Sequence, residues 1–331
     1  MKGTYRFRVG SKRSVFEFTI RRNITIIKGD SGTGKTTLLN MLYEYLRIGR
    51  ESGFSVDASV SYYVYMRREV GREWNEVLGK LSNTVIFIEE NNEFIFTEEF
   101  ASYVMTSGNY FVFVNRTPMH MLPYSIHEIY EIVTTAGHRG LKETYHEIKE
   151  LYSNFPLIMI DEVGTVITED SNSGMEFMEK VYSRCDVVSS GGNTGIIRTI
   201  EEKLPDNILV VSDGAAFGAY IEETISTIRS HNESRIALWL PESFEYLVLK
   251  SGVVKSGHID EVLSDPSEWI DSAQFGSWER FFTDFLMELT RDSEHPYSKK
   301  RLSVFYLSDS SVLKILNTFP AELIPESMLN R

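Results

Sequence analysis

ITIIKGDSGTGKTT, residues 24–37, is the stretch of this sequence that decides its fold. Its first four residues, 24–27, are apolar or β-branched, which predicts a short buried strand. The glycines that follow let the chain wrap tightly and turn its backbone N–H groups inward. Apolar residues then recur at helical spacing over 38–46, and Gly49 is a typical helix stop. The segment therefore predicts a strand, a tight glycine-rich loop and an amphipathic helix in direct succession.

The loop fits Gly-x-x-x-x-Gly-Lys-Thr and resembles the Walker A motif of P-loop nucleotide-binding proteins. Its backbone N–H groups and the positive end of the following helix suit a phosphate group. We expect Lys35 to neutralise the β- and γ-phosphates and the Thr36 hydroxyl to bind Mg²⁺. The implied cofactors are ATP or GTP together with Mg²⁺. The predicted nucleotide-binding residues are Gly29, Asp30, Ser31, Gly32, Thr33, Gly34, Lys35, Thr36 and Thr37.

A Mg²⁺–nucleotide site also requires a carboxylate at the end of a neighbouring strand. The segment VIFIEE, residues 85–90, resembles a Walker B strand with Glu in place of the usual Asp. We expect Glu89 to hold the metal through water and Glu90 to orient the attacking water. Alternatively, the two acids mark where a buried strand meets solvent. The next strand ends at Asn115 and Arg116, where either residue is placed to sense the γ-phosphate, and Arg116 equally fits an ordinary surface arginine.

The pattern along the chain predicts an α/β fold of two series. An N-terminal β-hairpin over 4–20 precedes a mainly parallel P-loop sheet with helices on both faces. The polar stretch 142–151 is expected to be helical, and beyond 256 the pattern turns wholly helical. The predicted domains are a nucleotide-binding domain at 1–152, a second α/β domain at 153–255 and a helical C-terminal extension at 256–331.

Composition bounds the class of protein. Of 331 residues 42% are hydrophobic and 24% are charged, which is typical of a globular chain. No apolar run fits a signal peptide or a membrane span, and the single cysteine, Cys185, excludes an internal disulfide. We therefore expect a cytoplasmic protein with no membrane partner.

Charge is unevenly distributed. The net charge of −13 argues against wholesale coating of a nucleic acid, but residues 1–50 hold eleven Lys/Arg and three Asp/Glu, a balance of +8. A basic phosphate-binding domain accounts for this balance. The alternative is a local nucleic-acid face built from Arg6, Arg8, Lys12, Arg13, Arg21 and Arg22.

Residues 165–250 resemble a TOPRIM domain, the metal-binding fold of topoisomerases, primases and OLD-type nucleases. The resemblance rests on an apolar strand ending in Glu169 and on the later strand ILVVSDG, residues 208–214. It implies that Glu169 is the general acid/base and that Asp213 is a metal ligand. Family members hold Mg²⁺ with an Asp-x-Asp pair, and here the second position is Ala215. This departure puts nuclease activity in doubt, because closely set carboxylates share the cation.

Asp170, or a glutamate within LPESFE, residues 240–245, is a substitute ligand if the fold brings it close. The alternative is a doubly wound domain in which these acidic residues lie at strand ends and have no catalytic or metal-binding role. Together the two halves resemble the layout of the OLD family, in which an ATPase gates a nuclease, over about residues 1–250. The chain is also similar to uncharacterised bacterial chains labelled translation initiation factor 2-like, a label that nothing here supports beyond the P-loop.

The leading functional hypothesis is a slowly hydrolysing ATPase switch that repositions the TOPRIM-like domain on a nucleic acid or a protein partner. The alternatives are a metal-dependent nuclease, a GTPase, for which Asp161–Gly164 fits Asp-x-x-Gly, and a small-molecule kinase. The C-terminal region is compatible with a homo-oligomer face or with core. The predicted catalytic residues are Lys35, Glu89, Glu90 and Glu169, and the predicted metal ligands are Thr36, Glu89 and Asp213.

Overall fold

The computed structural model describes residues 1–29, 32–67, 73–135, 144–153, 162–231 and 235–329. The chain divides into two compact units. Unit 1 comprises Met1–Asn154 and Asp265–Ser277, and unit 2 comprises Phe155–Ser264 and Trp278–Arg331. Residues 256–331, expected as a separate extension, therefore contribute to both units.

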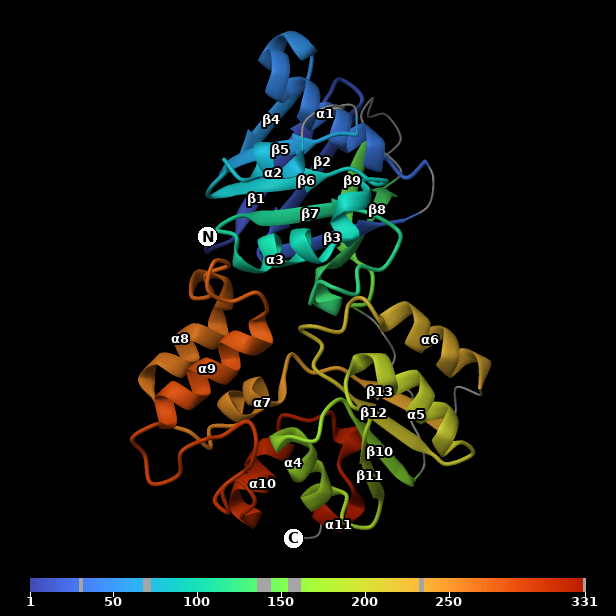
Figure 1. The fold of residues 1–331 in the computed structure, drawn as a ribbon, viewed down its shortest axis with the longest axis vertical. Helices are drawn as coiled ribbons and strands as arrows, with labels where there is room; N and C mark the ends of the chain where they lie inside the picture. Colours follow the sequence, from blue (N-terminus) through green and yellow to red (C-terminus); the bar gives the residue numbers. More distant parts are fainter. Residues whose placement is uncertain (30–31, 68–72, 136–143, 154–161, 232–234, 330–331) are drawn as a thin grey trace. The chain divides into compact units, whose positions relative to one another are not determined.

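Unit 1 is a mixed α/β body built on one large sheet (Figure 1). Among the described residues this sheet has nine strands in the order β4-β1-β2-β9-β8-β3-β7-β6-β5. The strands are β1 (Tyr5–Gly10), β2 (Ser14–Ile20), β3 (Ile24–Lys28), β4 (Ser55–Ala58), β5 (Ser61–Tyr65), β6 (Thr84–Ile88), β7 (Tyr110–Val114), β8 (Ile129–Thr135) and β9 (Thr144–Glu150). The α-helices are α1 (Lys35–Ile48), α2 (Trp74–Leu78) and α3 (Glu98–Thr106).

The pairing in this sheet is partly parallel and partly antiparallel. β5, β6, β7 and β3 pair in parallel, as the alternating pattern predicted. β8, a strand that the sequence analysis did not predict, also pairs in parallel with β3. β1 and β2 form the expected antiparallel hairpin, with Tyr5 opposite Ile20. The helix expected over 142–151 is wrong, because β9 occupies this stretch and pairs with β2 and β8. Its side chains alternate between half-buried and exposed, so its polar composition reflects a strand with a solvated face.

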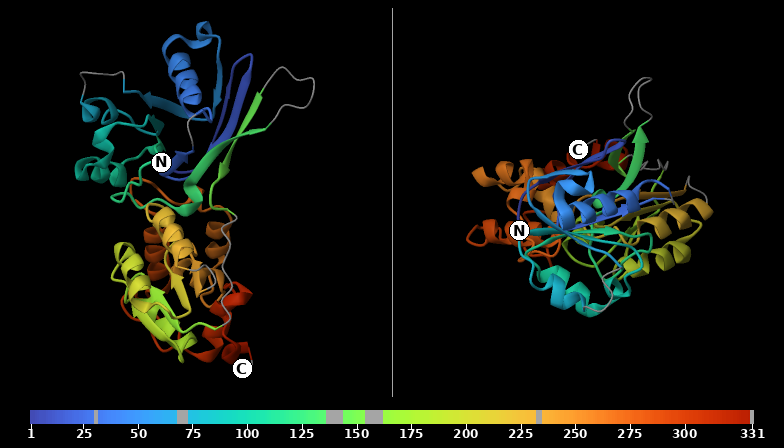
Figure 2. Two further views of the ribbon diagram at one scale, coloured as in Figure 1. Left: turned by 90° about the vertical axis from the view of Figure 1, so that its right-hand side faces the viewer. Right: turned by 90° about the horizontal axis from the view of Figure 1, so that it is seen from above.

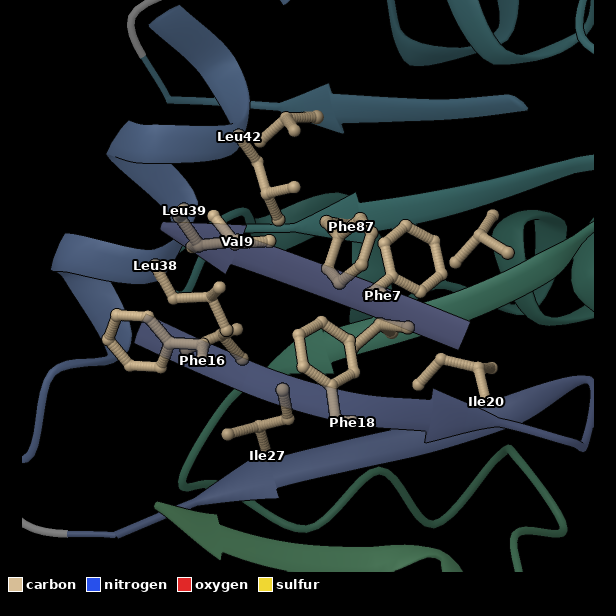
Figure 3. Packing of buried hydrophobic residues seen from close by; sticks show 14 of the residues in the cluster. Phe7, Val9, Phe16, Phe18, Ile20, Ile27, Leu38, Leu39, Leu42 and Phe87 are labelled. Atoms are coloured by element: carbon tan, nitrogen blue, oxygen red, sulfur yellow. The ribbon is translucent and has the colours of Figure 1, made fainter. Parts of the chain in front are cut away.

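α1 packs against one face of the unit 1 sheet (Figure 3). β4 and β5 are the opposite ends of the strand order, yet only residues 59–60 separate them in sequence, so the sheet must curl until these ends approach. Rings from several strands surround the helix, and each contributes about 2 kcal/mol by leaving water. The main members of this core are Phe7, Phe16, Phe18, Leu38, Leu39, Leu42 and Phe87.

α3 covers the opposite face of the same sheet (Figure 2). Successive residues of a strand point to opposite faces of the sheet, so β7 contributes side chains to the cores on both faces. Val112 joins the core around α1. Phe111 and Phe113 instead lie edge-on to Phe100 of α3, each with ring centroids 6.1 Å apart. The sheet is thus covered on both faces, which explains why β6 and β7 read as continuous apolar runs.

Unit 2 is a second α/β body. Its described strands form a four-stranded parallel sheet in the order β11-β10-β12-β13. Because the chain reverses direction across the sheet after β11, right-handed crossovers place α4 and α5 on opposite faces. The strands are β10 (Thr165–Thr168), β11 (Asp186–Ser189), β12 (Ile208–Val211) and β13 (Ile236–Trp239). The helices are α4 (Ser173–Val181), α5 (Ile196–Lys203), α6 (Ile221–Ser230), α7 (Phe244–Lys250), α8 (Gly257–Ser264), α9 (Trp278–Thr290), α10 (Asp309–Leu316) and α11 (Glu326–Leu329).

The segment 265–277, which we call the anchor segment, belongs to unit 1 although unit 2 elements precede and follow it. The N-terminal ammonium lies 2.8 Å from the Asp271 carboxylate. The Ser272 hydroxyl donates to a carbonyl at the end of α3, at 3.0 Å. Asn23, next to β3, donates its side-chain N–H to the Gly276 carbonyl at 2.8 Å. These contacts fix the anchor segment at the edge of the sheet where β3 begins.

Candidate functional site

The loop from β3 to α1 has the backbone that its glycines predict. Asp30 and Ser31 lie outside the described residues. Gly29, Gly32 and Gly34 have φ values of 124°, 88° and 103°, a region that favours glycine. A Cβ on Gly34 would also lie 3.4 Å from the Phe16 ring. At this position, therefore, the backbone conformation favours glycine, and an added Cβ would contact Phe16.

Lys35 opens α1 and is nearly buried, with 6% of its surface exposed. Its ammonium donates to the Gly29 carbonyl and to the Thr33 hydroxyl, the latter at 3.2 Å. The first turn of α1 carries no acidic side chain. The positive end of the helix and the lysine therefore act on the same loop.

Residues from three neighbouring strands meet beside this loop. A hollow is lined by Gly32, Gly34, Lys35, Thr36, Thr37, Glu90 and Arg116. Glu90 follows β6 and Arg116 follows β7, and the Arg116 Nε lies 3.7 Å from the Glu90 carboxylate. Parallel strands end at one edge of a sheet, which is why these positions converge. The structure thus brings Glu90 and Arg116 to the predicted phosphate loop.

Glu89 and Asn115 are differently placed. The Glu89 carboxylate accepts a hydrogen bond from the Arg67 backbone N–H at 2.9 Å, beyond the end of β5. Asn115 donates its side-chain N–H to the Thr117 carbonyl at 2.8 Å and so holds the turn after β7. Of the two predicted acids, Glu90 is the one that lines the hollow.

In unit 2 the structure brings Glu169 and Asp213 into one pocket. They follow the adjacent parallel strands β10 and β12, so they meet at the carboxyl edge of this sheet. The Ser212 hydroxyl lies 2.8 Å from both the Glu169 carboxylate and the Asn193 side-chain oxygen, and its single proton serves one of them. Asp213 accepts the Phe244 N–H at 3.2 Å, which ties it to the first turn of α7.

Four further charged residues line this pocket: Asp170, Glu245, Glu279 and Lys299. Glu245 belongs to the segment named as a source of a substitute ligand, and its carboxylate accepts a hydrogen bond from the Tyr297 hydroxyl at 2.9 Å. Glu279 and Lys299 come from the C-terminal region and form an ion pair at 2.5 Å. Sequence reasoning missed this pair because neither residue stands in a recognisable motif.

The unit 2 carboxylates raise one another's proton affinity. Burial, reinforced by Glu279, Glu245 and Glu169, raises the pKa of Asp213 well above its usual range. Burial likewise raises the pKa of Glu245 and of Glu169, although Lys299 opposes the shift at Glu245. The carboxyl groups of this pocket therefore hold their protons more tightly than isolated carboxyl groups do.

The predicted metal ligands belong to two separate predicted sites, one in each unit. Thr36 belongs to unit 1 and Asp213 to unit 2. Among the described residues, no group of three or more His, Cys, Asp or Glu side chains has an arrangement that could hold a metal ion. Ala215, where the resemblance implies a second Asp, is 2% exposed. A Cβ on Gly214 would lie 2.7 Å from the Leu240 carbonyl, so this turn packs closely against the chain after β13.

Two of the six residues of the proposed basic face pair with a buried carboxylate inside unit 1. Arg22 is 6% exposed, and it and Arg21 both pair with the fully buried Glu128, at 3.3 and 3.1 Å. Arg8 is exposed, but Glu17 stands opposite it on β2 and Asp57 on β4. Acidic residues inside unit 1 and on neighbouring strands therefore compensate part of the positive charge of residues 1–50.

The Asp-x-x-Gly segment, 161–164, falls in unit 2, whereas the phosphate loop falls in unit 1. Asp161 is outside the described residues, and Gly164 immediately precedes β10 in unit 2. No helix in the described part of the chain is long and apolar enough to cross a membrane. No protein-family model, curated protein or solved structure matches this chain.

Proposed function

We propose that this chain is a P-loop NTPase that binds ATP or GTP with Mg²⁺ in unit 1 and hydrolyses it slowly. The observation that carries the proposal is the convergence of the loop before α1 with Lys35, Glu90 and Arg116 at one hollow. A glycine loop feeding a helix N-terminus is a phosphate-binding arrangement. Glu90, at the end of β6 in the same sheet, adds the carboxylate that a Mg²⁺–phosphate site requires.

The residues present suit the cofactor. The Thr36 hydroxyl and the Glu90 carboxylate are hard oxygen ligands of the kind that Mg²⁺ prefers, directly or through water. Bound Mg²⁺ would neutralise the charge on the β- and γ-phosphates. Lys35 would exchange its contacts with Gly29 and Thr33 for phosphate oxygens, and Arg116 would face the terminal phosphate. Since Glu89 binds the Arg67 amide, we assign the water-orienting role to Glu90.

We further propose that the nucleotide state controls unit 2, which we interpret as a TOPRIM-like body with an altered metal site. The anchor segment supports such coupling. Asn23, at the start of the strand that leads into the phosphate loop, binds Gly276. Only Ser277 separates Gly276 from the start of α9. The second residue of α9 is Glu279, which lines the unit 2 pocket. The acceptor on which unit 2 acts would be a nucleic acid or a protein.

Nuclease activity is the less favoured function. The second metal-binding Asp is replaced by a buried Ala215, and Lys299 lines the same pocket as Asp213. The motif that distinguishes the GTPase alternative, Asp161–Gly164, belongs in sequence to unit 2, whereas the phosphate loop belongs to unit 1. Base preference stays open between ATP and GTP.

The test is steady-state release of phosphate from MgATP and MgGTP by the full chain. We expect turnover to fall at least about 100-fold in Glu90→Gln, as loss of a positioned base does. Glu89→Gln is the matched control and should retain most of the activity. Equal activity in all three proteins would remove the assignment of Glu90, and absence of turnover in the wild type would remove hydrolysis from the proposal.

The coupling is tested separately by hydrogen exchange. We expect nucleotide to change exchange in the peptides around Glu279 in the wild type, and this response to be lost in Asn23→Ala while nucleotide still binds. A wild-type unit 2 that does not respond to nucleotide would contradict the coupling, whatever the hydrolysis rate.

A further inference from the structure

The unit 2 pocket collects acids from four separate parts of the chain. Glu169 and Asp170 follow β10, Asp213 follows β12, Glu245 lies in α7 and Glu279 lies in α9. Lys299 is the single basic side chain among the residues that line it. Such a concentration of carboxylates costs free energy unless a cation compensates it.

Lys299 supplies this positive charge. Its ammonium donates to the Glu279 carboxylate at 2.5 Å. Asp213 and Glu245 line the same pocket as this ammonium. Lys299 therefore sets one positive charge among these three carboxyl groups.

A short segment, Tyr297–Leu302, holds this lysine in place, and we call it the strap. The Lys299 carbonyl accepts the Ser173 N–H at 2.8 Å. The Leu302 N–H donates to the Glu176 carboxylate at 2.6 Å. The Tyr297 hydroxyl lies 2.7 Å from the Ser173 hydroxyl and also binds Glu245. The strap is thus fixed on the first turn of α4, on both sides of Lys299.

Glu245 shows that the pocket is not fully compensated. Its side chain is almost wholly buried, with 1% of the residue exposed. One carboxylate oxygen binds Tyr297, and the other has no hydrogen-bond partner among the described residues. A buried carboxylate oxygen without a donor is costly, and a cation brought closer would satisfy it.

We propose that Asp213, Glu245 and Glu279 form a latent site for a hard divalent cation, which the chain fills with the ammonium of its own Lys299. The strap keeps this internal cation in position. In this structure the strap is closed. No three carboxylates among the described residues are then arranged so that they could hold a metal ion. Unit 2 binds Mg²⁺ or Mn²⁺ at these residues only when the lysine is withdrawn.

This inference goes beyond nucleotide binding in unit 1, and it assigns two ligands, Glu245 and Glu279, that the TOPRIM resemblance does not supply. It also gives a physical reason for tolerating Ala215. An ammonium on a flexible stem replaces the metal, so the lost carboxylate is no longer needed.

The test titrates Mn²⁺ into the nucleotide-free full chain, with free Mn²⁺ followed by electron paramagnetic resonance. We expect Lys299→Met to bind one Mn²⁺ at least about tenfold more tightly than the wild type. Lys300→Met, which removes the exposed neighbouring lysine, is the matched control and should match the wild type. Adding Asp213→Asn to Lys299→Met should abolish the new site.

Two outcomes would overturn the proposal. In the first, Lys299→Met gains no Mn²⁺ binding although circular dichroism shows it folded. In the second, the wild type already binds Mn²⁺ through Asp213. If Lys299→Met does not fold, amine labelling of the wild type tests whether the Lys299 ammonium is held in the pocket. We expect Lys299 to react about tenfold more slowly than Lys300, and equal rates would show that the ammonium is not held in the pocket.

Discussion

The hollow in unit 1 and the pocket in unit 2 occupy equivalent edges of two sheets but have opposite electrostatics. Both lie where parallel strands end, and each contains one lysine. Lys35 binds a carbonyl and a hydroxyl in a loop with few acids. Lys299 binds a carboxylate among several. The first arrangement sets a lysine beside the positive end of a helix, which suits an anionic ligand. In the second, the lysine pairs with a carboxylate.

The two units also differ in how they bury carboxylates. In unit 1, Glu128 is fully buried between Arg21 and Arg22, and the Thr25 hydroxyl donates to it at 3.1 Å. Burial raises the pKa of Glu128, and the two arginines act against the rise. In unit 2, Asp213 faces mainly other carboxylates. Removing a buried negative charge should therefore weaken unit 1 and strengthen unit 2.

The largest expected effect is that of Glu128→Gln. It removes the buried charge with which Arg21 and Arg22 pair, which should destabilise unit 1 by about 3 kcal/mol. Hydrogen exchange of unit 1 peptides would measure the loss, with the exposed Glu147→Gln as control. A change no larger than that of the control would show that Glu128 does not compensate the arginines.

Gly34→Ala should have the next largest effect. A residue with a side chain at φ 103° is strained by about 2 kcal/mol, and here its Cβ also meets the Phe16 ring. We expect weaker nucleotide binding and a less stable unit 1, measured by calorimetry and thermal unfolding. Gly32→Ala separates the two causes, because it has a similar φ and no atom within 4 Å of the added Cβ. Equal losses in both variants would exclude the contact with Phe16 as a cause.

Asp213→Asn should act in the opposite direction. Asn keeps the oxygen that accepts the Phe244 N–H and removes the charge that its neighbours oppose. We expect unit 2 to gain about 1 kcal/mol at neutral pH. Loss of exchange protection in unit 2 would instead indicate that the Asp213 carboxylate is stabilising there.

The smallest and most gradual effect is the pH dependence of unit 2. The folded-state pKa values of Asp213, Glu245 and Glu169 are raised above their unfolded values near 4. Their contribution to stability is therefore complete below about pH 4 and is lost as the pH rises through the folded values. Unit 2 should gain protection on acidification from about pH 8 to about pH 5, and Asp213→Asn should reduce the gain. A flat profile would contradict the shared proton affinity of the pocket.

Local patterns predicted much of this fold. The apolar run at β3, the helix α1 and the hairpin of β1 and β2 follow from residues close in sequence. β9 was misread as a helix because its polar alternation carries meaning only beside β2 and β8. The division at the anchor segment depends on contacts such as Asn23 with Gly276, which no local pattern encodes.

The candidate sites show the same limit. The glycine loop is a contiguous motif, and the end of β6 indicated a carboxylate nearby. Which of two adjacent acids faces the loop depends on strand orientation, and the structure places Glu90 there. In unit 2, Glu169 and Asp213 end neighbouring strands, whereas Lys299 reaches the pocket from a segment 86 residues beyond Asp213. A contact between segments so far apart in the chain leaves no periodic pattern in the sequence.

The most direct test of the central claim is calorimetric titration of MgATP and MgGTP into the wild type, Lys35→Ala and Lys12→Ala. Lys12 carries the same charge on the exposed hairpin turn and is the matched control. We predict that the wild type and Lys12→Ala bind one nucleotide equally, and that Lys35→Ala loses at least about 100-fold in affinity. Unchanged binding in Lys35→Ala, or no binding to the wild type, would contradict the account.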